Sequence, residues 1–198
     1  MLAADVLHND PRHPDLARFI ANHAIRFGDF QLTSERASSY YCDGKQVSFS
    51  GEGAALIADA IIEELQGLEF DAVGGMDMGA TPIVATLALR LHQMGRGTPT
   101  FVVRKQAKEH GTRRRVEGLM PQRPSKVVIV DDVVTTAGSI LQSIEAVRDA
   151  GHEVVLALAM LDREEGGAER LKAARIAYRP LVRISEIDLD RLREQQAR

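Results

Sequence analysis

Hydrophobic residues recur at helical spacing in two segments near the start of the chain. The first predicts a helix over about residues 15–27, with its apolar side formed by Leu16, Phe19, Ile20, His23 and Phe27. The second predicts a helix over about residues 53–65, with its apolar side formed by Leu56, Ile57, Ile61, Ile62 and Leu65. The stretch between them, FQLTSERASSYYCDGKQVSFS, favours β structure and has a turn signal at Asp43–Gly44.

From Phe70 onward, short apolar runs alternate with amphipathic segments. The runs DAVGGM, TFVVR, KVVIVDD and EVVLALAML predict strands. PIVATLALRLHQM predicts a helix that starts with proline, and AGSILQSIEAVRDAG predicts a helix that ends at Gly151. Apolar strands that alternate with helices are typical of a parallel sheet covered on both faces. We therefore expect an α/β fold with a central, mainly parallel sheet flanked by helices, in a single domain over residues 1–198.

The regular pattern lapses between Arg104 and Arg123. The intervening RKQAKEHGTRRRVEGLMPQR is polar and basic, and it contains glycine. Irregular segments of this length inside compact domains are usually functional or disordered.

Composition and charge limit the function classes. A formal net charge of −3 gives no overall attraction to nucleic acid or to an anionic membrane, so any anion site must be local. Cys42 is the only cysteine, which excludes an internal disulfide and argues against a cysteine-based zinc site. Because no apolar run suits a signal peptide or a membrane span, we expect a cytoplasmic protein without nucleic-acid or membrane partners.

The segment VVIVDDVVTTAGS carries the strongest chemical signal. A buried strand leads to Asp131 and Asp132, and small or hydroxylated residues follow before a helix begins. Ligands of open parallel sheets bind beyond the carboxyl ends of the strands, and a helix N-terminus favours phosphate. The carboxylates would repel that phosphate unless they hold ribose hydroxyls, a magnesium ion, or both. The alternative is that they only cap the next helix.

VVIVDDVVTTAGS resembles the phosphoribosyl pyrophosphate (PRPP) signature of type I phosphoribosyltransferases. The resemblance implies that Asp131 and Asp132 bind the ribose hydroxyls. We expect Mg²⁺ to be held through PRPP, and whether Asp131 and Asp132 also bind it directly stays open. The resemblance also implies that the 5-phosphate is bound by Thr135, Thr136, Ala137, Gly138 and Ser139. The segment is no Walker loop, because the chain lacks GxxxxGK[ST].

RKxxKxHG, within FVVRKQAKEHGTRRRVEG, resembles the catalytic loop of the orotate phosphoribosyltransferase family. By position, Lys105 would contact pyrophosphate in its own subunit, whereas Arg104, Lys108 and His110 would reach the neighbouring site, which implies a homodimer. Lys108 and His110 would stabilise the departing pyrophosphate. A loop that closes and excludes water strengthens such charge pairs. A solvated basic loop or a nucleic-acid patch is the alternative, and we expect the arginines at 113–115 to be solvated.

Three further segments resemble the same family on the base-binding side. GDFQLTSERASSYYCDG resembles its N-terminal hood, to which residues 1–50 would contribute, and Tyr41 would stack on the pyrimidine. AVGGMDMGATPIVA resembles the pyrophosphate-side loop, with a turn at residues 79–81. MLDREEGG resembles the segment whose arginine contacts orotate, here Arg163, whose planar fork suits a carboxylate; Thr135 would also contact orotate. Arg163 could instead form a surface ion pair, and Tyr40 and Tyr41 could be plain strand aromatics.

The chain departs from the family pattern at several positions. Glu35 stands where glycine is usual, and Ser39 stands where proline is common. Thr33 and the lysine-free GGMDMGATP occupy regions where some members carry lysines. Asp77 adds a carboxylate near the expected pyrophosphate, where it could contact a metal ion or water.

The sequence as a whole predicts a magnesium-dependent orotate phosphoribosyltransferase of UMP biosynthesis, which acts without a protein nucleophile. Two alternatives remain open. One is a phosphoribosyltransferase for another nucleobase, against which the segment around Arg163 and the RKxxKxHG loop argue. The other is a non-catalytic regulator that senses PRPP and binds nucleic acid, against which the near-neutral charge argues.

Overall fold

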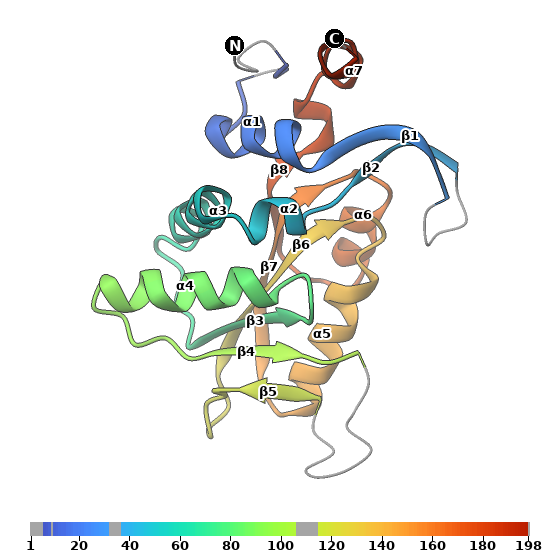
Figure 1. The fold of residues 1–198 in the computed structure, drawn as a ribbon. Coiled ribbons are helices and arrows are strands. Elements are labelled where there is room, and N and C mark those ends of the chain that lie inside the picture. The colour runs from blue at the N-terminus through green and yellow to red at the C-terminus, as the bar shows by residue number, and fades with distance from the viewer. Residues whose placement is uncertain (1–5, 9, 32–36, 106–114, 198) are drawn as a thin grey trace.

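The computed structural model describes residues 6–8, 10–31, 37–105 and 115–197 of the chain (Figure 1). The elements follow one another as α1 (Pro14–His23), β1 (Ile25–Gln31), β2 (Ala37–Cys42), α2 (Lys45–Ser48), α3 (Gly51–Glu64), β3 (Ala72–Met76), α4 (Thr81–Gln93), β4 (Thr100–Val103), β5 (Val116–Gly118), β6 (Lys126–Val134), α5 (Gly138–Asp149), β7 (Glu153–Asp162), α6 (Gly167–Ala173), β8 (Tyr178–Arg183), the 3₁₀ turn η1 (Ile184–Glu186) and α7 (Leu189–Gln196).

A six-stranded sheet forms the centre of the molecule, in the order β5-β4-β3-β6-β7-β8. All neighbouring strands are parallel except β4 and β5, which are antiparallel. The prediction of an α/β fold with a mainly parallel sheet is therefore confirmed. β1 and β2 form a separate two-stranded antiparallel sheet.

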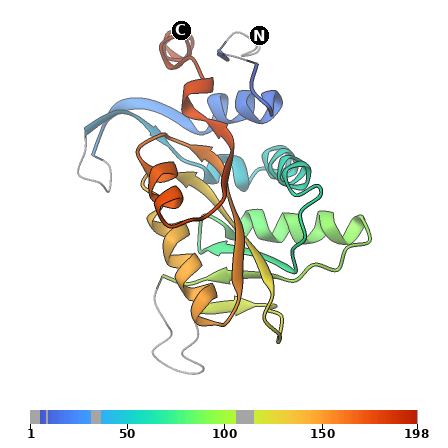
Figure 2. The same ribbon diagram turned by 180° about the vertical axis from the view of Figure 1, so that it is seen from behind.

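Helices cover both faces of this sheet, as the apolar strand runs predicted. Along β6, Val128 and Val130 belong to a buried cluster that includes residues of α1, α3 and α4. Val127 and Ile129 belong to a second cluster that includes residues of α5 and α6. Figures 1 and 2 show α3 and α4 on one side of the sheet, and α5 and α6 on the other. Because successive side chains of a strand point to opposite faces, an unbroken apolar run supplies both cores.

The largest difference from the predicted elements is at the first helix. α1 ends at His23, and Ile25–Gln31 forms β1 rather than a continuation to Phe27. Ile25 pairs with Cys42 and Phe27 with Tyr40 across the two-stranded sheet, and Ile25 is fully buried. Pairing with β2 thus overrides a helical periodicity that the short apolar segment also satisfies. The turn signal at Asp43–Gly44 leads into the short helix α2.

Three other features were not predicted from the sequence. β6 continues past Asp131 and Asp132 to Val134, because β7 offers a pairing partner as far as Asp162. β5 lies inside the segment that lacked a regular pattern, where it pairs antiparallel with β4. The C-terminal elements α6, β8 and α7 complete the sheet edge and its cover. Within the described ranges, no helix combines the length and apolar character that crossing a lipid bilayer requires.

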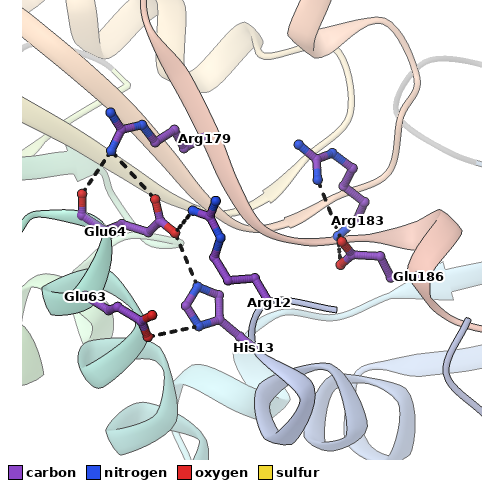
Figure 3. A network of polar contacts seen from close by, with 7 residues as sticks. All are labelled: Arg12, His13, Glu63, Glu64, Arg179, Arg183 and Glu186. Atoms are coloured by element: carbon purple, nitrogen blue, oxygen red, sulfur yellow. Dashed lines mark hydrogen bonds and ion pairs between the residues drawn. The ribbon is translucent and has the colours of Figure 1, made fainter. Parts of the chain in front are cut away.

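A buried carboxylate links the N-terminal segment to the rest of the molecule (Figure 3). Glu64, at the end of α3, forms an ion pair with Arg12 and lies 3.5 Å from His13 Nε2. Arg179 of β8 lies 3.7 Å from the Glu64 carboxylate and donates a hydrogen bond to its backbone carbonyl at 3.1 Å. Glu64 therefore joins three parts of the chain that are far apart in sequence.

Candidate active site

Two consecutive carboxylates lie near the carboxyl end of β6, that of Asp131 buried and that of Asp132 partly buried. The Asp132 N–H donates to the Asp131 carboxylate at 3.1 Å, and the Val133 N–H donates to Asp132 Oδ1 at 2.8 Å. Burial raises the pKa of Asp131 well above its ordinary value, and the charge of Asp132 raises it further. Burial also raises the pKa of Asp132. Both carboxylates would therefore be stabilised by hydroxyl donors or by a cation.

The loop after β6 leads directly into the N-terminus of α5. Ala137 has a left-handed backbone, with φ of 58°, and no side chain caps the helix. The alternative reading, in which Asp131 and Asp132 cap α5, is thus wrong. The uncapped N–H groups at this helix start suit an anion. Arg170 of α6 donates to the Thr136 carbonyl at 2.7 Å and so holds the loop in place.

The turn between β3 and α4 passes directly beside the two aspartates. A Cβ added to Gly79 would lie 2.9 Å from Asp132 Cγ and 3.0 Å from Asp131 Oδ1, so only glycine fits without displacing them. The Thr81 hydroxyl donates to the Asp77 carboxylate at 2.7 Å, which gives Asp77 a role in closing the turn. In the described part of the chain, no group of three or more His, Cys, Asp or Glu could hold a metal ion.

The segment between β2 and α2 borders the same carboxylates from another side. A Cβ on Gly44 would lie 2.8 Å from Asp132 Oδ2. Lys45 lies 2.7 Å from Asp43, which raises the pKa of the lysine, and its charge acts to lower the pKa of Asp132. Sequence analysis missed Lys45, because the hood resemblance ended at Gly44 and nothing local relates it to β6.

Arg163 follows the end of β7 and lies against β6. Its N–H donates to the Val134 carbonyl at 2.9 Å. Its guanidinium carbon lies 4.6 Å from the centre of the Tyr40 ring, and Nη2 lies 2.8 Å from Glu165. Because Arg163 is only 4% exposed, the alternative of a surface ion pair is wrong. The backbone hydrogen bond to Val134 places Arg163 next to β6, the strand that carries the two aspartates.

Tyr40 and Tyr41 have different surroundings in β2. Tyr40 lies under the Arg163 guanidinium, and burial raises the pKa of its phenol. Tyr41 is exposed and packs against Phe30, with ring centres 5.6 Å apart. The aromatic residue that contacts Arg163 is therefore Tyr40, whereas stacking of Tyr41 on a pyrimidine stays a prediction.

The described part of the basic loop lies at its two ends. Arg104 lies 3.7 Å from Glu117 of β5, and its N–H donates to the Arg115 carbonyl at 2.8 Å. Lys105 is exposed, and its charge acts to lower the pKa of Asp131. Arg115, which was expected to be solvated, donates to the Arg104 carbonyl at 3.4 Å. The predicted roles of Lys108 and His110, together with Thr33, Glu35, Arg113 and Arg114, fall outside the described residues.

Comparison with known proteins agrees with this geometry. The phosphoribosyl transferase domain family matches residues 45–178. The orotate phosphoribosyltransferase of Rhodopseudomonas palustris is 40% identical over 86% of this chain and 93% of its own. That of Streptomyces avermitilis is 40% identical over 88% of this chain and 96% of its own.

A solved structure shares the same fold. The crystal structure of the Mycobacterium tuberculosis orotate phosphoribosyltransferase in complex with PRPP superposes with a TM-score of 0.74. The two sequences are 29% identical, over 90% of this chain and 100% of the other. With the aspartate pair, the uncapped helix start and the buried arginine at one edge of the sheet, these likenesses show that the chain belongs to the orotate phosphoribosyltransferase family, within the type I phosphoribosyltransferase fold.

Proposed function

We propose that this chain transfers the phosphoribosyl group of PRPP to orotate, giving orotidine 5′-monophosphate and pyrophosphate in UMP biosynthesis. One observation carries the proposal. β6 delivers Asp131, Asp132 and the loop into α5 to the edge where Arg163 hydrogen-bonds to Val134. The groups that we assign to the ribose, to the 5-phosphate and to the orotate carboxylate thus follow one another along the chain or hydrogen-bond to it. The names of the relatives and the PRPP complex of the Mycobacterium tuberculosis enzyme support orotate and PRPP as the substrates.

Each part of the site suits one part of the substrates. Asp131 and Asp132 would accept hydrogen bonds from the ribose hydroxyls, which relieves the unfavourable burial that raises their pKa. The N–H groups and hydroxyls of residues 135–139 would bind the 5-phosphate at the start of α5. Arg163 would bind the orotate carboxylate, because its fork-shaped guanidinium matches a planar anion.

The reaction requires positioning and electrostatics rather than a protein nucleophile. Loss of pyrophosphate from the anomeric carbon leaves positive charge on the ribose, so the site must hold ribose and base in line. Lys45 and Lys105, both close enough to influence the aspartate pair, would attract the charged leaving group. Arg104, Lys108 and His110 are assigned to the pyrophosphate by resemblance, and their roles stay predictions.

The aspartate pair also fits a magnesium ion. Its carboxylates are the oxygen ligands that Mg²⁺ prefers, and burial makes their charge unfavourable without a partner. With only two carboxylates together, the ion would share its shell with PRPP oxygens and water. When bound, Mg²⁺ would neutralise charge on the pyrophosphate. A homodimer with shared sites, a single domain with a hood over residues 1–50, and a cytoplasmic location are parts of the proposal that rest on the resemblance.

The proposal is tested by mixing the purified protein with orotate, PRPP and magnesium, and following the loss of orotate absorbance. Parallel reactions contain uracil, hypoxanthine, adenine or xanthine, and a further one contains a chelator. We expect turnover of orotate alone, abolished by the chelator and strongly reduced by Arg163→Ala and Lys108→Ala. Turnover of another base would retain the PRPP site but overturn the assignment of orotate. PRPP binding without turnover of any base would favour the regulator.

A further inference from the structure

Two nitrogen atoms of the Arg163 guanidinium differ in their surroundings: Nη2 has acceptors nearby, whereas Nε has none among the described residues. Nη2 lies 2.8 Å from Glu165 Oε1 and 3.4 Å from Ser38 Oγ, and the flat face of the group lies on Tyr40. Nε is buried, and none of the described residues offers it a hydrogen-bond acceptor. A buried donor without an acceptor is unfavourable and points to a ligand that supplies one.

Glu165 supplies a charge that Arg163 needs in order to stay where it is. The Arg163 side chain is 3% exposed, whereas that of Glu165 is 20% exposed, so the carboxylate reaches from the rim to a buried cation. Without it, the described contacts of the guanidinium would be the ring and side-chain hydrogen bond of Tyr40 and a long hydrogen bond to Ser38, none of which carries a negative charge at neutral pH. A buried charge that loses its partner leaves for solvent or distorts its surroundings.

A neighbouring glutamate does not share this role. The Glu164 carboxylate accepts a hydrogen bond from the Ser185 N–H at 3.0 Å, which turns it toward η1 and away from Arg163. Glu164 is exposed, and its backbone is left-handed with φ of 56°. The two consecutive glutamates therefore have separate partners, and only Glu165 is paired with Arg163.

We propose that Glu165 is a positioning residue for the base site. It fixes the guanidinium on Tyr40, so that the remaining N–H groups face a planar base that carries a carboxylate. Glu165 touches no substrate in this scheme and acts only through Arg163. The inference rests on the proposed function, because it takes Arg163 as the group that binds the carboxylate of orotate.

Glu165 also has an opposing effect, because its negative charge repels the carboxylate of a bound base. The two effects change the affinity in opposite directions when Glu165 is removed. Loss of positioning raises KM for orotate, and loss of repulsion lowers it. We expect positioning to dominate, since Glu165 is partly solvated and its repulsion is screened, whereas Arg163 is buried.

The test compares steady-state kinetics of the full-length wild-type protein with Glu165→Ala, Glu165→Gln and the matched control Glu164→Gln. Glu165→Ala should raise KM for orotate about tenfold or more, the loss expected for a charge-assisted hydrogen bond. KM for PRPP should stay within about twofold of the wild-type value, because the residues that we assign to PRPP belong to β6 and to the start of α5 rather than to the segment that carries Glu165. Glu165→Gln keeps the shape and one acceptor, so its KM should be intermediate, and Glu164→Gln should match the wild type.

A double variant separates positioning from a general structural effect. If Glu165 acts through Arg163, then Arg163→Ala and the double variant Arg163→Ala/Glu165→Ala should have the same KM for orotate. A further rise in the double variant, an unchanged or lower KM in Glu165→Ala, or an equal rise in KM for PRPP would overturn the inference. Should Glu165→Ala fail to fold, the isosteric Glu165→Gln decides by the same criteria. Absence of orotate turnover by the wild type would instead overturn the proposed function, which keeps the two failures distinguishable.

Discussion

Gly79 lies where the turn between β3 and α4 passes beside the aspartate pair, so a methyl group added there reaches the carboxylates directly. The Cβ of Gly79→Ala would lie 2.9 Å from Asp132 Cγ and 3.0 Å from Asp131 Oδ1, and it would overlap Asp132 Oδ1. Asp132 has little freedom to yield, because it is partly buried and accepts a hydrogen bond from the Val133 N–H at 2.8 Å. The substitution therefore displaces the groups that we assign to the ribose.

The size of the effect follows from these distances. Carbon and oxygen atoms in contact prefer a separation near 3.5 Å, so the carboxylate or the turn must move by roughly 0.5–1 Å. A misplacement of about 1 Å in a catalytic site can lower the rate about 100-fold, which corresponds to about 2.7 kcal/mol of transition-state stabilisation. We expect Gly79→Ala to lower kcat/KM for PRPP by about this factor, while a folded protein remains.

The assay is the loss of orotate absorbance at varied PRPP, with thermal unfolding of each variant to verify folding. Gly97→Ala is the matched control, because a Cβ at Gly97 would meet nothing within 4 Å. It should keep wild-type kinetics. A change in kcat/KM of less than about twofold would be far smaller than the expected loss. That result would show that the aspartates do not need this geometry, and it would refute their assignment to the ribose.

Four further predictions concern single side chains. Glu64→Gln should lower the free energy of unfolding by about 1–2 kcal/mol and Tm by about 2–8 °C, because the Glu64 side chain is 3% exposed. The control Glu63→Gln, at a side chain that is 60% exposed, should leave Tm nearly unchanged. Equal shifts in Tm would contradict the stabilising role of the ion pairs around Glu64. Asp131→Asn should raise Tm of the substrate-free protein at neutral pH while weakening PRPP binding. Burial raises the pKa of Asp131 in the folded state, so its ionised form destabilises the fold above that pKa, and the gain should fade as the pH drops toward the ordinary value of 3.8; a lower Tm at pH 7 would contradict this. Lys45→Ala should raise KM for PRPP severalfold with little change in KM for orotate, and unchanged kinetics would remove Lys45 from the site. Burial raises the pKa of Cys42 to about 12, so iodoacetamide should label it at pH 8 only after unfolding, and rapid labelling of the native protein would refute its burial.

Local patterns in the sequence were sufficient to predict the structure where a few consecutive residues determine it. The segment from Val127 to Ser139 predicted a buried strand, two acids and a helix start, and the structure contains all three. Arg163 was singled out by resemblance to a short family motif, and its contact with orotate stays a prediction. Periodicity failed at the first helix, because the segment Ile25–Gln31 is decided by its pairing with β2 rather than by its own spacing. The Asp131–Asp132 strand also runs to Val134, since β7 continues to pair with it.

The neighbours of these residues could not be predicted, because they come from distant parts of the chain. Nothing near Arg163 in sequence indicates that Tyr40 lies under its guanidinium, and local charge alone suggested a surface ion pair where the structure has a buried one. Lys45 was likewise missed, although it borders Asp132, because its relation to β6 arises only from folding.

By itself, then, the sequence determined the alternation of strands and helices, the parallel character of the sheet, and the strand, loop and helix that carry the aspartates. These features depend on the spacing of apolar residues and on the residue types within about a dozen consecutive positions, so neighbouring residues are enough to specify them. Only the tertiary structure decided that Gly44 and Gly79 meet around the aspartate pair, and that Tyr40 of β2 lies on the Arg163 guanidinium. That meeting depends on the strand order β3-β6-β7 and on the packing of β2 over it, which follow from burying both faces of the sheet at once.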